Sequence, residues 1–85
     1  MNEIAKKATA EKLVRTMEVE GLKNKVDMGR KLGIHGNYIS MILNEKTWFK
    51  CPNHAWEAVL NWLNSGYTLE QYAKKYPPVI KVVIS

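Results

Sequence analysis

Apolar residues recur at helical spacing along most of this chain, and glycines or prolines interrupt the pattern at intervals. The first uninterrupted segment, residues 3–20, contains no Gly or Pro. Its apolar positions fall on one side of a helix, at Ala10, Leu13, Val14 and Met17. Asn2 is placed to cap this helix and Gly21 to end it. The pattern therefore predicts a first helix over residues 3–20.

Two shorter helical segments follow, with Gly33 between them. Asn24 can accept a hydrogen bond from a backbone N–H at the start of the earlier of these two segments. Asp27, at the third helical position, carries a negative charge that stabilises the positive end of the helix dipole. This second helix is therefore expected to begin at about Lys25 and to end at Gly33. The third helix, residues 36–44, is expected to bury Ile39, Ile42 and Leu43 and to leave Asn37, Ser40, Met41 and Asn44 facing more nearly outward. Two short helices joined by a glycine turn are the layout of a helix-turn-helix.

A fourth helix is expected after a loop over residues 45–51. Pro52 suits its first position, because the N–H that proline lacks has no partner there in any case. Residues 64–66, Asn-Ser-Gly, close the helix. Its apolar residues form two adjoining stripes, one of Trp56, Leu60 and Leu63 and the other of Ala55, Ala58, Val59 and Trp62. Apolar residues on more than one side of this helix must be shielded from water, so the helix is either central in the fold or part of an interface.

A short fifth helix is predicted from the capping-box residues Thr68 and Gln71. Its apolar face consists of Leu69, Tyr72, Ala73 and Tyr76. Pro77 and Pro78 terminate it.

The C-terminal segment, residues 79–84 (VIKVVI), is β-branched apart from Lys81, which favours an extended strand. No second strand is apparent. Pairing with the same strand of a second subunit would satisfy both edges and create a two-fold dimer, whereas the alternatives are packing against the body or disorder at the terminus. We expect an all-α fold, a compact four- to five-helix bundle over residues 1–78, with a short extended strand in the tail, residues 79–85.

Composition narrows the class of protein. The chain has 85 residues, of which 46% are hydrophobic and three are tryptophan, which is enough for one core. A formal net charge of +5 favours a polyanionic partner without identifying one. The single cysteine, Cys51, excludes an intrachain disulfide and suits a reducing compartment. Met1 opens a polar segment without an apolar core, and no run approaches the roughly 20 apolar residues of a membrane span. We expect a cytoplasmic protein with no membrane partner.

The stretch KVDMGRKLGIHGNYISMILNEK, residues 25–46, resembles the helix-turn-helix of the Cro/lambda-repressor-like family, the xenobiotic-response-element type of regulator. The matching residues are the Leu-Gly-aliphatic turn and the Tyr-Ile-Ser of the recognition helix, namely Leu32, Gly33, Ile34, Tyr38, Ile39 and Ser40. The resemblance covers roughly residues 10–63. It implies a five-helix bundle that binds operator DNA, commonly as a dimer, with the third helix in the major groove.

Three positions depart from the family pattern. Gly29 stands where alanine is usual, and His35 stands where a serine or threonine often caps the recognition helix. Gly36 occupies an early position that in the family often bears a base-reading glutamine. Direct base readout is therefore expected to be reduced.

Four residues of the third helix are candidates for reading bases. Asn37 can donate and accept toward an adenine edge, and Met41 can contact a thymine methyl group. Ser40 and Asn44 can reach bases or phosphates. The candidates for contacts with the DNA backbone are three lysines near the two ends of the motif, Lys25, Lys46 and Lys50, and also Tyr38 within it. For the lysines, the alternative is that they are ordinary solvated charges.

Other chemistry finds little support. Cys51 and His54 have the spacing of half a zinc site, but a structural zinc needs about four ligands and only His35 remains, so we expect no metal. The helical spacing of the aromatic residues favours a core over a platform for single-stranded nucleic acid. Trp48 and Phe49 are exceptions in the predicted loop, where they either anchor it or contact a partner. No phosphate-binding glycine loop or Ser-His-Asp arrangement is apparent, so we expect neither an enzyme nor a cofactor.

These observations predict a small sequence-specific DNA-binding protein, a transcriptional regulator that inserts the helix over residues 36–44 into the major groove of double-stranded DNA. A homodimer through residues 79–84 would accompany it. The alternative is a helical adaptor that uses the same bundle to bind a protein. Its support is the weak recognition residues Gly36 and Met41 and the apolar surplus of the fourth helix and the tail.

Overall fold

The computed structural model describes residues 1–78, and within them nearly all the chain is helical. Five α-helices and one 3-10 helix follow one another: α1 (Glu3–Glu20), α2 (Lys25–Leu32), α3 (Gly36–Leu43), η1 (Glu45–Lys50), α4 (Asn53–Ser65) and α5 (Leu69–Lys75). The predicted all-α class is confirmed. The strand and dimer segment predicted at residues 79–84, and the tail 79–85 as a whole, lie outside the described residues.

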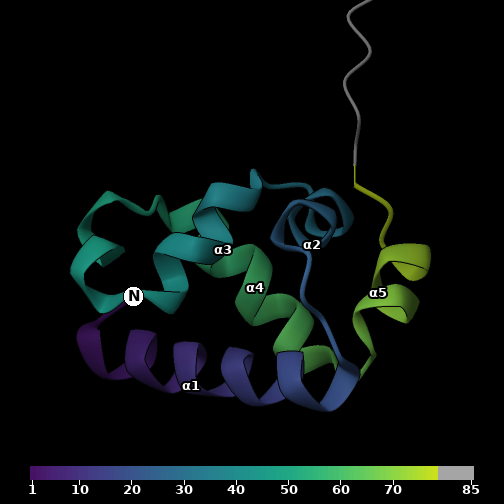
Figure 1. Cartoon of the computed structure of the whole chain (residues 1–85), viewed down its shortest axis with the longest axis horizontal. Helices are drawn as coiled ribbons and strands as arrows, with labels where there is room; N and C mark the ends of the chain where they lie inside the picture. The colour runs from purple at the N-terminus through teal and green to yellow at the C-terminus, as the bar shows by residue number, and fades with distance from the viewer. Residues whose placement is uncertain (79–85) are drawn as a thin grey trace, which may run out of the picture.

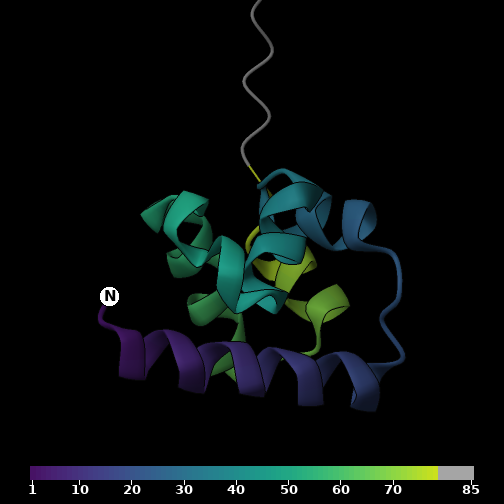
Figure 2. The ribbon, with the colours of Figure 1, turned by 60° about the vertical axis from the view of Figure 1, so that its left-hand side comes forward.

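Helix α4 lies at the centre of the bundle. It packs against α1, α2, α3 and α5. In Figure 1, α1 runs along the lower side, and in the turned view of Figure 2 the other helices all lie above it. The apolar stripes of α4 predicted either a central helix or part of an interface, and the structure shows a central helix. No helix within residues 1–78 is long and apolar enough to cross a membrane.

The core draws at least one side chain from every helix. Two tryptophans of α4, Trp56 and Trp62, are its largest fully buried members. Around them lie the buried residues Leu13 of α1, Met28 of α2, Ile39 and Ile42 of α3, Trp48 of η1, Ala55, Val59 and Leu63 of α4, and Leu69 of α5. The two fully buried isoleucines of α3 determine which side of this helix faces the core. The opposite side of α3 therefore faces outward.

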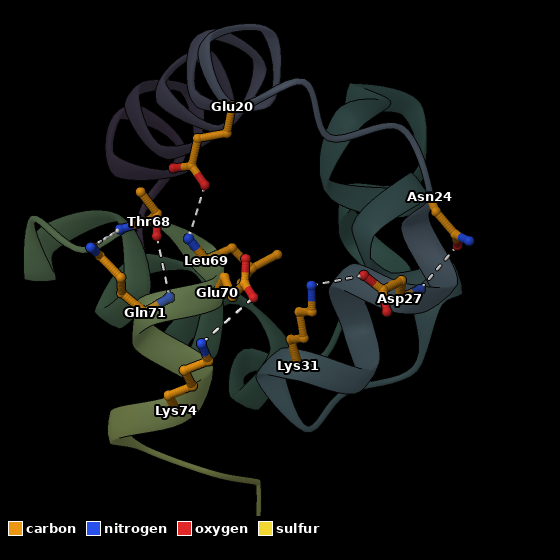
Figure 3. A network of polar contacts seen from close by, with 9 residues as sticks. All are labelled: Glu20, Asn24, Asp27, Lys31, Thr68, Leu69, Glu70, Gln71 and Lys74. Carbon is orange, nitrogen blue, oxygen red and sulfur yellow. Dashed lines mark hydrogen bonds and ion pairs between the residues drawn. The ribbon is translucent and has the colours of Figure 1, made fainter.

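The helix limits follow the local signals in the sequence. The Oδ1 atom of Asn24 accepts a hydrogen bond from the backbone N–H of Asp27 at 3.0 Å, and the predicted capping box of Thr68 and Gln71 is present (Figure 3). Gly33 ends α2 in the left-handed conformation, with φ of 75°. A contact between distant parts of the chain fixes α5, because Glu20 accepts a hydrogen bond from the backbone N–H of Leu69 at 2.9 Å.

The segment after α3 differs from the prediction. The loop expected over residues 45–51 is mostly the 3-10 helix η1, and α3 ends at Leu43 rather than at Asn44. The reason is that the Oδ1 atom of Asn44 caps η1 by accepting from the backbone N–H of Lys46 at 3.1 Å. Pro52 is the residue before α4 rather than its first residue. Leu43, expected to be buried, is half-buried.

Candidate nucleic-acid interface

Helices α2 and α3 approach so closely that two positions admit only glycine without a shift of the backbone. A Cβ atom at Gly29 would lie 2.6 Å from the carbonyl oxygen of Ile34 and 2.9 Å from the backbone nitrogen of Gly36. A Cβ atom at Gly36 would lie 2.9 Å from the Cα of Val26. Both departures from the family pattern thus have a physical cause. The Cβ direction of Gly36 points at α2, so any side chain there would have to displace that helix before it could reach a partner.

The third departure, His35, still serves as the cap of α3. Its Nδ1 atom accepts a hydrogen bond from the backbone N–H of Asn37 at 3.1 Å. A ring nitrogen therefore does what a serine or threonine hydroxyl commonly does at a helix N-terminus. This bond holds the backbone of Asn37, the first candidate base-reading residue, in a defined position.

Replacing His35 with alanine is expected to lower the free energy of unfolding by about 1 kcal/mol, because the helix loses its only side-chain cap. The side chain is exposed and its ring contact is an edge-to-face approach to Tyr38 at 6.2 Å between centroids, so little buried area is lost with it. His35→Ser restores an acceptor and should recover most of the loss. Urea denaturation of the two variants and the parent measures both effects. Equal stabilities for the alanine and serine variants would show that the cap contributes nothing.

The candidate base-reading residues, three on α3 and Asn44 directly after it, are not equally available to a partner. Asn37 and Ser40 are exposed, as expected. Asn44 is also exposed, but its Oδ1 atom is engaged in capping η1, which leaves the amide NH₂ as its freer group. Met41 is half-buried and packs against the core, so it faces outward less than the helical spacing predicted. Asn37 and Ser40 are therefore the least encumbered of the four.

The three candidate backbone lysines bracket this face. Lys25 begins α2, and its carbonyl oxygen would lie 3.1 Å from a Cβ at Gly36, so it adjoins the N-terminal end of α3. Lys46 and Lys50 lie on η1, beyond the C-terminal end, and all three side chains are exposed. Glu45 is the only acidic residue of residues 36–50. At eight residues, α3 is about 12 Å long, comparable to the roughly 12 Å width of the major groove.

Tyr38, the fourth candidate for the DNA backbone, has a more enclosed setting. It is half-buried between two exposed histidines. The ring of His54 lies 5.6 Å from it, centroid to centroid, and the ring of His35 lies 6.2 Å from it, both edge-to-face. This packing fixes the ring orientation of Tyr38, and a role toward DNA stays a prediction.

Two apolar residues are exposed here: Val26, whose exposure was not predicted, and Phe49, which was expected either to anchor the loop or to contact a partner. Val26, at the start of α2, is 66% exposed, and Phe49 of η1 is 79% exposed. Helical spacing contains the signal for Val26, because it lies two positions from the buried Met28 and therefore on the opposite side of the helix. Phe49 lies within residues 45–51, where a loop was expected, so the regular turn of η1 that positions its side chain was not predicted.

The fold brings no further zinc ligands to Cys51 and His54. Within residues 1–78, no three His, Cys, Asp or Glu side chains come together as a metal site. Cys51 is buried, with its Sγ atom 4.0 Å from the carbonyl oxygen of Tyr38. Burial raises the pKa of the Cys51 thiol, and the nearby positive charge of Lys6 offsets part of that rise. Cys51 is a packing residue.

Fold and surface together describe an all-α protein whose α2–α3 pair presents an exposed polar helix face between lysines. Comparison with protein-family models, with curated proteins and with solved structures finds no match for this chain. The resemblance to the Cro/lambda-repressor-like family therefore rests on the residues quoted above.

Proposed function

We propose that this protein binds double-stranded DNA in a sequence-dependent manner. In this proposal it is a small transcriptional regulator that is located in the cytoplasm. The observation that carries the proposal is the outer face of α3. Its exposed polar residues sit on a helix locked against α2 by glycine contacts, and lysines lie at both of its ends. A rigid helix of this length with cationic flanks suits the dimensions and charge of the major groove.

The roles within the proposed interface follow from the hydrogen-bonding capacity of each side chain. Asn37 has both a donor and an acceptor and can pair with the N6 and N7 atoms of adenine. Ser40 can donate to a base or a phosphate, and Asn44 can donate through its NH₂ group. Met41 has only its outer part to offer to a thymine methyl group. Lys25, Lys46 and Lys50 contact phosphates and so fix the register of α3 on the duplex.

Selection from a random-sequence pool of duplexes tests the proposal. Under the proposal, repeated rounds with the full chain enrich a short motif. A motif with two-fold symmetry would in addition support the homodimer through residues 79–84, with half-sites about one helical turn apart. If no motif were enriched and no duplex bound even at low salt, the proposal would be wrong.

The salt dependence of binding identifies the phosphate contacts. Lys25→Ala, Lys46→Ala and Lys50→Ala are each expected to weaken binding on every sequence and to reduce the slope of log K against log salt by about one unit. Lys12→Ala on α1 is the matched control, because it removes one exposed charge outside the proposed face. Fluorescence anisotropy at four or five salt concentrations gives the slopes. If Lys12→Ala reduced this slope by the same amount, the attraction to DNA would come from the overall charge of the protein and not from the proposed face.

A protein-binding adaptor is the second candidate, and one surface feature favours it. A groove of about 490 Å³ lies between the C-terminal half of α1 and α3. Its apolar lining residues are Val14, Met17, Leu22 and Leu43. The apolar stripes of α4, which were part of the support for an adaptor, lie mainly in the core, and the apolar tail lies outside the described residues. A pull-down that recovered only nucleic acid would count against this candidate.

A further inference from the structure

Phe49 combines strong exposure with a rigid position. Its side chain is 79% exposed, the most of any aromatic residue among residues 1–78. Exposed apolar side chains are ordinary on protein surfaces, and one that sits on a mobile loop would need no explanation. Phe49 differs because the residues around it are anchored.

Four contacts hold η1 in place against the end of α3 and the core. The indole N–H of Trp48 donates to the carbonyl oxygen of Ile42 at 2.7 Å, and its ring packs edge-to-face on Trp56 with centroids 5.5 Å apart. The hydroxyl of Thr47 lies 3.0 Å from the carbonyl oxygen of Met41, to which it can donate. The backbone N–H of Cys51, itself buried, donates to the carbonyl oxygen of Trp48 at 3.1 Å. The backbone on either side of Phe49 is therefore fixed.

The surroundings of Phe49 are cationic. Lys50 places its Nζ atom 5.5 Å from the centroid of the Phe49 ring, and Lys46 lies one turn earlier on the same short helix. A partner that covers this surface must therefore carry negative charge and also offer an apolar or aromatic surface to the ring. The wall and floor of a DNA groove supply both, as phosphates beside sugars and base edges.

We propose that Phe49 inserts into the DNA minor groove next to the major-groove site of α3, with Lys46 and Lys50 on the phosphates between the two grooves. This inference rests on the proposed function. Its geometric support is the continuity of α3 with η1: a helix that spans the major groove delivers the segment after its end to the phosphate backbone. The adjoining minor groove lies directly beyond that backbone. Apolar side chains are known to serve as wedges in that groove.

The test uses the full chain and a fluorescein-labelled duplex that carries the motif selected by the unmodified chain. Phe49→Ala is expected to lower the affinity about tenfold, because the variant no longer buries an aromatic ring against the sugars and base edges of the groove. The salt slope should not change, because no charge is removed. Phe49→Leu should retain part of the affinity. Val19→Ala on α1 is the matched control, since that side chain is 86% exposed and belongs to another face.

A second duplex separates the minor groove from other contacts. Inosine in place of guanine in the base pairs beside the motif removes the N2 amino group from the minor groove and leaves the major-groove acceptors in place. The unmodified chain should bind this duplex severalfold more tightly than the guanine duplex, whereas Phe49→Ala should bind both equally. Thermal unfolding followed by circular dichroism verifies that each variant is folded.

The outcomes distinguish this inference from the proposed function. If Phe49→Ala binds as tightly as the unmodified chain while Lys46→Ala still reduces the salt slope, DNA binding stands and the role of Phe49 is overturned. If the unmodified chain and Phe49→Ala respond equally to inosine, the minor-groove contact is overturned. If the unmodified chain binds no duplex, both proposals fall.

Discussion

Replacing Gly29 with alanine is expected to lower the free energy of unfolding by about 2 to 3 kcal/mol. Helix propensity alone predicts the opposite sign, since alanine in a helix interior is favoured over glycine by roughly 0.5 to 1 kcal/mol. The added Cβ, however, would lie 2.6 Å from the carbonyl oxygen of Ile34 and 2.9 Å from the nitrogen of Gly36. Both are backbone atoms, so relief requires α2 and α3 to move apart. Urea denaturation measures the change.

Gly21→Ala is the matched control for this prediction. Gly21 ends α1 with φ of 66°, and nothing lies within 4 Å of a Cβ built there. Its replacement therefore incurs only the cost of the left-handed conformation, about 1 to 2 kcal/mol. Because separation of the two helices also displaces α3, Gly29→Ala should weaken DNA binding, whereas Gly21→Ala should not. A Gly29→Ala variant as stable as the parent would contradict the close approach of α2 and α3.

Replacing Asn37 with alanine is expected to reduce the affinity for the selected duplex by roughly 5- to 150-fold, a loss of about 1 to 3 kcal/mol. Asn37 is exposed, and its backbone is held by the hydrogen bond to His35, so its amide can present a donor and an acceptor without much rearrangement. A duplex with the contacted base pair changed should bind the variant and the parent about equally. Competition binding with the two duplexes gives both values.

Asn61→Ala controls for the loss of an exposed amide elsewhere, because Asn61 lies on the outer side of α4. It should leave both affinities unchanged. If Asn37→Ala weakened binding to both duplexes by the same factor, Asn37 would be a backbone contact and not a reader of sequence.

Helix limits were the most predictable part of this fold. Short-range hydrogen bonds and backbone conformation determine them, and Asn24, Gly33 and Thr68 each display the residue type that the position requires. The 3-10 helix η1 was not predictable in the same way. It depends on Trp48 reaching the carbonyl oxygen of Ile42 and on the side chain of Asn44 turning forward along the chain, and no periodic pattern encodes such contacts.

The candidate site was partly predictable for a related reason. Spacing along α3 correctly placed Asn37 and Ser40 on the exposed side, because the isoleucines at positions 39 and 42 fix the inner face. It could not foresee that Met41 packs against the core. The positions that depart from the family pattern are explained only by contacts between helices, as at Gly36, or by a side chain in an uncommon role, as at His35.

The proposed function requires that the outer face of α3, with its lysine flanks, binds duplex DNA. Titration of the ¹⁵N-labelled chain with the selected duplex, followed by amide chemical shifts, tests it most directly. We expect the largest shifts on the start of α2, on residues 36–44 and on η1, and none on the outer side of α1. Shifts centred on the α1 side of the groove, at Val14, Met17 and Leu22, with Asn37 and Ser40 unaffected, or no shifts with any duplex at low salt, would contradict it.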